Sequence, residues 1–266
     1  MRRELRMWRV ASGVLALMLL VMVALQSAEH VTVAWERLTF KLFPSAELAM
    51  TYGQRHFSSR SSAAYNISHA KYFFEQALTL NPRYPYLYHE VARVAFLEGK
   101  FQKALQSINL QIENQGLDTP NSYYVRGLIK GFMGDYAGSA RDYEVYLETD
   151  PTNWAAINDY AWVLLKAGRV EDALLATTFG LSKFPRNPWL LNSNAIALHE
   201  LGFKGPAREQ AIRALKEVQL LSEEEWLRAY PGNDPKIAEA GVLAFKDALI
   251  GNVHSILLEA KKTELQ

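Results

Sequence analysis

The sequence contains no cysteine. Disulfide bonds, thiolate metal ligands and cysteine nucleophiles are therefore excluded. An excess of positive charge is also missing, because 29 lysine and arginine residues face 28 aspartate and glutamate residues. Nucleic-acid-binding proteins usually carry such an excess, since basic side chains displace the counterions of the phosphates. We therefore expect no nucleic-acid partner.

Motifs for catalysis and cofactor binding are missing as well. None of the six histidines pairs with a second histidine or a carboxylate at the spacing of metal ligands. The sequence has no glycine-rich phosphate loop and no nucleophile elbow. We predict that the protein is not an enzyme and has no catalytic residues, metal, cofactor or small-molecule substrate.

One long hydrophobic run stands at the N-terminus. Residues 10–25 carry no charge, and the apolar stretch extends over residues 7–28. This length is close to the ~20 residues that a helix needs to cross a bilayer. It predicts a transmembrane anchor that, with its short N-terminal tip, occupies residues 1–28. A cleaved signal peptide and a buried core helix are the alternatives.

Basic residues precede this run. They are Arg2, Arg3, Arg6 and Arg9, with Glu4 as the one acid among them. Positive charge stays on the cytoplasmic side of a membrane segment. We therefore predict a single-pass protein with a cytoplasmic N-terminus and an extracytoplasmic remainder, compatible with a bacterial envelope.

A juxtamembrane linker follows over residues 29–47. Trp35, Leu38 and Leu42 recur at helical spacing, and Pro44 ends the run. This apolar stripe predicts a helix that packs on the first element of the next domain. The alternative is an amphipathic helix that lies on the membrane surface.

A period of about 34 residues organises the next part of the chain. Glycines recur at spacings of 35, 34 and 34, at Gly99, Gly134, Gly168 and Gly202. Five positions after each glycine stands a small residue: Ala104, Ser139, Ala173 and Ala207. Prolines at Pro82, Pro151 and Pro185 are 69 and 34 residues apart, so both markers place one extra residue in the same interval.

Each period predicts a pair of helices. A glycine ends the first helix, where a positive φ is favourable for glycine. The small residue lets the second helix approach its neighbour closely, and the proline prevents that helix from continuing. One pair cannot bury its apolar face alone, so successive pairs must stack.

These residues resemble the tetratricopeptide repeat (TPR) family. The second half of its motif is matched by Ala70, Phe74, Ala77 and Pro82. The turn is matched by Gly134, Asp135, Tyr136, Gly168 and Ala173, and the first helix by the small residues Ala92, Gly127, Ala161 and Ala195. The resemblance covers residues 48–220. It implies an all-α, right-handed solenoid of about five TPR-like helix pairs.

Two departures from the family pattern carry expectations. Arg126 and Lys130 occupy positions that are usually apolar. We expect that their helix is rotated so that Leu128, Ile129 and Phe132 face inward; the alternative is that the two bases line a surface. Thr177 and Gly180 predict looser packing in the fourth repeat.

The C-terminal part, residues 221–266, predicts two further helices. Ser222 and Glu225 form a capping-box pattern that starts a short helix. A last helix is predicted over residues 236–260, after a turn at residues 231–235. It is expected to cap the end of the solenoid, and the alternative is a docking helix for a partner.

In the TPR arrangement the first helices of the pairs line the concave face, so equivalent residues form rows across the repeats. The residues of these rows predicted to bind a partner are Tyr86, His89, Arg93, Tyr124, Leu128, Asn158, Trp162, Trp189, Asn192 and Ile196. Amides can pair with a peptide backbone, and aromatic side chains are frequent in binding hot spots.

The sequence therefore predicts a membrane-tethered scaffold that binds a peptide or protein partner on the concave face of its repeats. A structural subunit of a larger envelope, secretion or pilus assembly is the alternative. An enzyme's regulatory domain is the third interpretation. The repeat scaffold itself does not choose among them, because it carries many unrelated functions.

Overall fold

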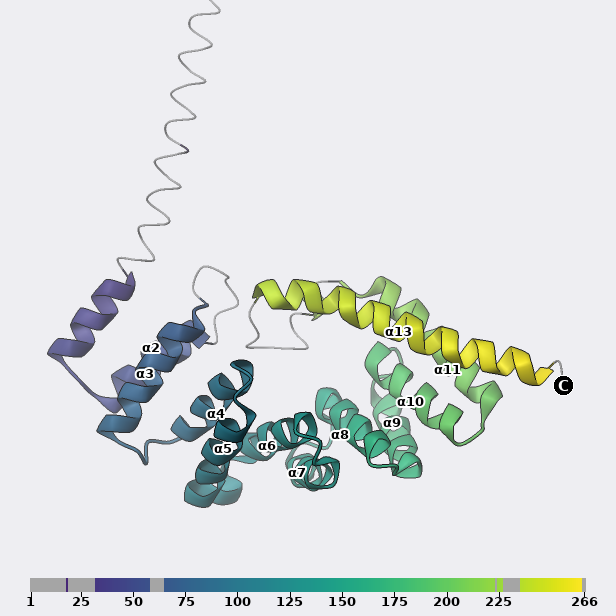
Figure 1. Ribbon diagram of the computed structural model, residues 1–266, viewed down its shortest axis with the longest axis horizontal. Helices are drawn as coiled ribbons and strands as arrows, with labels where there is room; N and C mark the ends of the chain where they lie inside the picture. Colours follow the sequence, from purple (N-terminus) through teal and green to yellow (C-terminus); the bar gives the residue numbers. More distant parts are fainter. Residues whose placement is uncertain (1–17, 19–31, 58–64, 223, 227–234, 265–266) are drawn as a thin grey trace, which may run out of the picture. The chain divides into compact units, whose positions relative to one another are not determined.

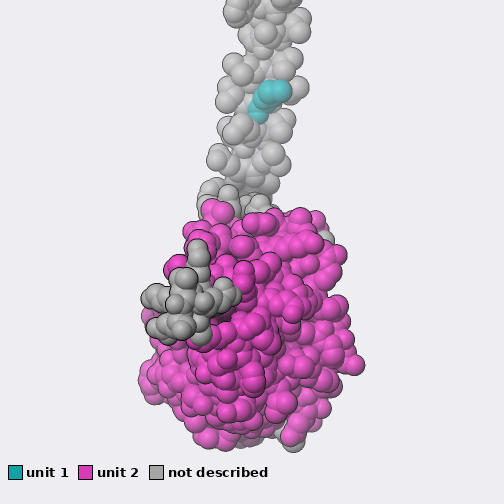
Figure 2. Space-filling view, turned by 90° about the vertical axis from the view of Figure 1, so that its right-hand side faces the viewer, with its two compact units in different colours: residues 1–81 teal, residues 82–266 magenta. Residues whose placement is uncertain are grey.

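The computed structural model describes Met18 and residues 32–57, 65–222, 224–226 and 235–264. The predicted anchor, residues 1–28, lies outside the described residues apart from Met18. The chain divides into two compact units, Met1–Asn81 and Pro82–Gln266, called unit 1 and unit 2. Figure 2, a view onto the end of unit 2, shows its side chains packed closely together.

Unit 1 contains a helix over residues 32–42, followed by α2 (Ala46–Phe57) and α3 (Ile67–Leu80) (Figure 1). The Asn66 side chain caps α3 by accepting a hydrogen bond from the backbone N–H of His69 at 3.0 Å. Its core is rich in aromatic side chains, which pack mainly edge to face. They include Phe40, Phe57, Phe73 and Phe74.

The described residues of unit 2 form four antiparallel helix pairs and a long terminal helix (Figure 1). The first helices of the pairs are α4 (Leu87–Leu97), α6 (Pro120–Phe132), α8 (Trp154–Lys166) and α10 (Pro188–Glu200). The second helices are α5 (Phe101–Gln115), α7 (Tyr136–Thr149), α9 (Val170–Lys183) and α11 (Lys204–Leu220). A short 3-10 turn, η1 (Gly116–Asp118), precedes α6, and α13 (Pro235–Glu264) follows the last pair.

The periodic glycines lie in the turns within the pairs, as predicted. Their φ angles are +72°, +85°, +74° and +82° at Gly99, Gly134, Gly168 and Gly202. This left-handed conformation is strained for residues with a side chain. The small residues five positions later are fully buried where the two helices of a pair meet. The predicted roles of the periodic glycines and of the small residues are therefore confirmed.

The second helices end shortly before the prolines. α7 and α9 end at Thr149 and Lys183, two residues before Pro151 and Pro185. The asparagines that follow, Asn153 and Asn187, accept N-cap hydrogen bonds at the start of α8 and α10. α5 has 15 residues where α7 and α9 have 14, so the extra residue of this interval lengthens a second helix.

The capping box at the C-terminal side is confirmed. The hydroxyl of Ser222 and its backbone N–H both donate to the Glu225 carboxylate, at 2.8 and 2.9 Å. Residues 224–226 form a short helical segment, and most of the predicted turn lies outside the described residues. The last helix packs through Leu249, Val253 and Ile256 on the apolar residues of α10 and α11.

By length and composition, one stretch of the described residues could cross a membrane, Gly241–Leu258 in α13. Of this stretch 22% is buried inside the protein. Its buried side chains include Leu249, Val253 and Ile256, which pack on α10 and α11.

The prediction of loose packing in the fourth repeat is wrong. Thr177 is fully buried, and its hydroxyl accepts a 2.9 Å hydrogen bond from the Asn194 amide on α10. A Cβ on Gly180 would lie 2.9 Å from a methyl of Leu190 and 3.1 Å from one of Ile157. The small residues therefore allow α9 to pack tightly against α8 and α10.

The helix of residues 32–42 packs on α2 and α3, as predicted, but not through its apolar stripe. Trp35 is 66% exposed, and Leu38 and Leu42 are exposed too. The helix of residues 32–42 instead turns Glu36 and Phe40 toward α2 and α3. The sequence did not indicate this, because a charged residue was not expected on the buried face.

Candidate functional site

Nine of the ten residues predicted to bind a partner lie on the first helices of unit 2, and the tenth, Tyr86, is the N-cap residue of α4. Equivalent positions on α4, α6, α8 and α10 follow one another at about the repeat length, so each predicted row crosses successive pairs. The rows differ in how far their side chains are available. The first row is hydrogen-bonded within the chain, the second ends in a buried aromatic cluster, and the third is partly exposed. The first row consists of His89, Tyr124, Asn158 and Asn192, the second runs from Tyr86 to Trp189, and the third consists of Arg93, Leu128, Trp162 and Ile196.

The first half of the hydrogen-bonded row joins α4, α6 and α8. Nδ1 of His89 lies 3.0 Å from the Ser122 hydroxyl, so α4 is linked to α6. The Tyr124 hydroxyl donates a 2.7 Å hydrogen bond to the Asp159 carboxylate and links α6 to α8. These side chains therefore stabilise the stacking of the pairs.

The second half of this row continues to α13. The Ser193 hydroxyl donates to the Asn158 side-chain oxygen at 2.9 Å, which links α8 to α10. The Asn252 amide of α13 donates to the Asn192 oxygen at 3.2 Å. The chain's own last helix therefore uses Asn192 for the contact that was predicted for a partner.

Burial shifts the pKa of His89 and of Asp159, the hydrogen-bond partner of Tyr124. Desolvation, and then the nearby Arg93 guanidinium, lowers the pKa of His89 to about 3, so this histidine is neutral at physiological pH. Desolvation raises the pKa of Asp159 to about 6, although the hydrogen bonds from Tyr124 and Asn158 oppose the shift. Since His89 is neutral and buried, it is a poor contact for a charged ligand.

The second row begins at Tyr86 and ends at Trp189. Tyr86 starts α4 with a φ of +60° and is partly buried. Trp189 is only 6% exposed. Its ring lies 4.9 Å from those of Trp154 and Phe245 and 5.8 Å from that of Trp226. The prediction that Trp189 is available to a partner is wrong, because α13 and the preceding short segment cover it.

The third row contains the exposed aromatic residue Trp162. Its side chain is 40% exposed and packs edge to face on Tyr136, with ring centroids 5.9 Å apart. The indole also lies over Gly131, where an added Cβ would be 3.3 Å from it. Of the other members of the row, Arg93 pairs with Glu90 at 3.0 Å, and Leu128 and Ile196 are partly buried.

Exposed apolar residues beside this row were missed by the sequence analysis. Phe132 is 59% exposed, and Leu97 and Met133 are exposed as well. The Phe132 ring lies 5.0 Å from that of Phe96, across the boundary between α4 and α6. The α4–α8 patch is defined here as Leu97, Phe132, Met133 and Trp162. One signal could have found part of it, since Leu97 and Phe132 stand four residues after row members Arg93 and Leu128.

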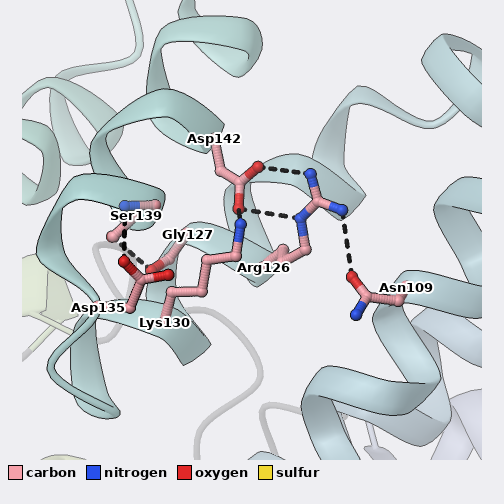
Figure 3. A network of polar contacts seen from close by, with 8 residues as sticks. Asn109, Arg126, Gly127, Lys130, Asp135, Ser139 and Asp142 are labelled. Atoms are coloured by element: carbon pink, nitrogen blue, oxygen red, sulfur yellow. Dashed lines mark hydrogen bonds and ion pairs between the residues drawn. The ribbon is translucent and has the colours of Figure 1, made fainter.

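The expected rotation of α6 is only partly correct. Ile129 is fully buried, but Leu128 is half-buried and Phe132 faces outward. Arg126 and Lys130 fold onto α7, where both bind the Asp142 carboxylate (Figure 3). The shortest distances are 2.6 Å from Arg126 and 2.7 Å from Lys130. The two bases therefore lie between α6 and α7 and do not form an open basic surface.

The described residues contain no group of three histidine, aspartate or glutamate side chains placed to hold a metal. The polar groups of the rows are instead distributed in pairs between neighbouring helices. The first helices offer exposed apolar side chains at or near their C-terminal ends, which are Leu97 on α4, Phe132 on α6 and Trp162 on α8.

Comparisons with known proteins agree with this architecture. A sequence profile of the tetratricopeptide repeat matches residues 143–174. No curated protein sequence matches the chain. The crystal structure of MamA protein has a TM-score of 0.57 at 14% identity, over 70% of this chain and 94% of that one. YrrB, described as a TPR protein with an unusual peptide-binding site, has a TM-score of 0.59 at 12% identity, over 68% and 91%.

At these identities the likeness concerns the fold. Together with the four helix pairs, the turn glycines and the matched profile, it shows that the chain has TPR-type repeats arranged as an all-helical solenoid. The expected fold class is confirmed to that extent.

Proposed function

We propose that this protein is a non-catalytic scaffold that binds a protein partner through the α4–α8 patch and is tethered to a membrane by residues 7–28. The observation that carries the proposal is the exposure of Trp162 and Phe132 at the C-terminal ends of neighbouring first helices. Exposure of large aromatic side chains to water is unfavourable, and such side chains are frequent in binding hot spots.

The patch is better suited to bind a partner than the polar groups of the first row. His89, Tyr124, Asn158 and Asn192 already have hydrogen-bond partners inside the chain, so a ligand would have to replace bonds of equal quality. Trp162 is held by Tyr136 and Gly131, so little side-chain entropy would be lost when a partner covers it.

The partner segment that fits best is an amphipathic helix. α13 provides an internal example, because its Phe245 stacks on Trp189 and its Asn252 binds Asn192. A partner helix with an apolar stripe would cover the α4–α8 patch by the same chemistry. The description of YrrB as having a peptide-binding site supports this use of the fold by analogy.

The membrane tether rests on the sequence. The uncharged run of residues 10–25 follows four arginines, which favours a cytoplasmic N-terminus and an extracytoplasmic repeat domain. Protease added to intact cells and to spheroplasts tests this topology. Digestion of the repeats in spheroplasts is expected, and full protection there would contradict the predicted orientation.

Affinity purification from detergent extracts tests the binding site. We expect the double variant Trp162→Ala plus Phe132→Ala to lose a protein that co-purifies with the wild type. The matched control is Leu175→Ala plus Phe179→Ala, which removes two exposed apolar side chains from the second helix α9. An unchanged set of co-purifying proteins in the first variant would exclude the α4–α8 patch as the binding site.

A structural subunit of a larger envelope assembly is the second candidate. It is favoured by the exposure of Leu175 and Phe179, because a fixed neighbour on that side would bury them as well. Loss of co-purifying proteins from both double variants would support this alternative over a scaffold with one binding face.

A further inference from the structure

The helix of residues 32–42 in unit 1 has two apolar faces. Its inner face carries Phe40, whose ring packs edge to face on Phe73 with centroids 5.9 Å apart. Its outer face carries Trp35, Leu38 and Leu42, which stand at positions i, i+3 and i+7 and are all exposed. Three large apolar side chains on one exposed stripe are costly in water.

The inner face is fixed by a buried ion pair. Glu36 is 1% exposed, and its carboxylate binds Arg55 at 2.5 Å and Nε2 of His56 at 2.7 Å, both on α2. Truncation of either partner would leave a buried charge, so this contact strongly selects one rotation of the helix. This contact with α2 therefore keeps the apolar stripe on the exposed side of the helix.

The exposed charges of this helix are positive. Glu36 is the only acid among residues 32–45, and it is buried and paired. Arg37 and Lys41 are exposed, and they lie about 100° and 140° around the helix from Glu36, beside the apolar stripe. The Arg37 guanidinium lies over the Tyr72 ring, 5.2 Å from its centroid. The outer side thus combines a tryptophan, two leucines and two cations.

We propose that this stripe lies in the headgroup region of an anionic lipid bilayer, with Arg37 and Lys41 on the phosphates. The proposal rests on the membrane tether proposed above. Helices with apolar and aromatic residues on one side and basic residues beside them bind at this depth, and tryptophan is enriched there. Anionic lipids attract the cations.

The position in the chain favours a lipid over a protein occupant. Trp35 stands seven residues after Ala28, the end of the predicted span. Even a fully extended linker of this length reaches only about 25 Å, so the stripe cannot move far from the surface of a bilayer that holds the span. Unit 1 would then be seated on the membrane rather than suspended from a flexible tether.

Site-specific fluorescence tests the proposal in the full-length chain, where the absence of cysteine makes single labelling straightforward. An environment-sensitive dye is attached to Leu38→Cys or Leu42→Cys, with Leu80→Cys as a matched exposed position on α3 and Leu17→Cys as a reporter of the span. Each variant is reconstituted in phosphatidylcholine vesicles with or without phosphatidylglycerol. Quenching by nitroxide lipids is then measured, and circular dichroism checks folding.

We expect the labels at positions 38 and 42 to be quenched several-fold more than the label at position 80, and more strongly with phosphatidylglycerol. Charge reversal by Arg37→Glu plus Lys41→Glu is expected to remove the effect of the anionic lipid. Quenching at 17 without quenching at 38 and 42 would overturn the interfacial helix and leave the tether intact. Quenching at 38 and 42 but not at 17 would support the interfacial helix and contradict the span. No quenching at any of the three positions would overturn both proposals.

Discussion

The Tyr124 hydroxyl donates a 2.7 Å hydrogen bond to Asp159 and joins the first helices of two successive pairs. The repeats are thus held together by polar contacts on the side where ligands were expected, in addition to their apolar core. The same side chains cannot serve both purposes without exchanging one hydrogen bond for another.

We expect the contribution of the Asp159 carboxylate to stability to depend on pH. Its pKa rises from 3.8 to about 6 on folding, so the folded state binds the proton more tightly. The contribution of Asp159 to the free energy of unfolding is greatest below about pH 4 and decreases as the pH rises to about 6. Above that pH it does not change further. The total change is about 3 kcal/mol. Asp159→Asn keeps an acceptor for Tyr124 and removes the titration.

Thermal unfolding of the wild type and Asp159→Asn between pH 4 and pH 7 measures this effect. We expect the variant to gain stability relative to the wild type as the pH rises from about 4 to about 6, with no further change above that pH. His89 titrates in the opposite sense, because its pKa is lowered to about 3, but it is present in both proteins and cancels in the difference. A difference that does not vary with pH would show that the pKa of Asp159 is not raised on folding.

The Asp142 carboxylate predicts a large loss of stability on truncation. It is 3% exposed and binds both Arg126 and Lys130 (Figure 3). In Asp142→Ala two partly buried cations lose their counter-charge, and we expect the free energy of unfolding to fall by about 2–4 kcal/mol. Asp172→Ala removes an exposed carboxylate that pairs with Arg169, and it should cost less than about 1 kcal/mol. Equal losses in denaturant unfolding would show that burial does not strengthen the Asp142 pairs.

Replacement of two helical glycines by alanine is expected to change the stability of the protein in opposite directions. Gly180→Ala brings a methyl against Leu190 and Ile157, and we expect a net loss of about 1–2 kcal/mol because overpacking exceeds the gain in helix propensity. Gly251→Ala on α13 meets nothing within 4 Å and should stabilise the protein by about 0.5–1 kcal/mol. Melting temperatures of both variants test the pair, and stabilisation by Gly180→Ala would disprove the tight packing of α9.

Much of the helix arrangement could be predicted from the sequence alone. The glycines at the turns and the small residues five positions later are set by local backbone conformation and by close approach of two adjacent helices. Both constraints recur in each pair, so they leave a period in the sequence. The capping box at Ser222 is local in the same way.

The candidate site was less predictable. Trp162 was predicted to lie in the binding rows and is exposed. Trp189 was predicted in the same way, but it is buried under α13. The sequence predicted that a last helix caps the solenoid, but it did not indicate that this helix would cover Trp189. Phe132 faces outward because Arg126 and Lys130 bind Asp142 on α7, a contact that spans two helices.

The sequence by itself determined the repeat, the positions of the turns and the apolar N-terminal run, because these follow from neighbours along the chain. Only the tertiary structure decided which side chains of the first helices and of the helix at residues 32–42 reach the surface. Exposure depends on what packs over a residue from elsewhere in the chain, and an apolar stripe looks the same in the sequence whether it is covered or not.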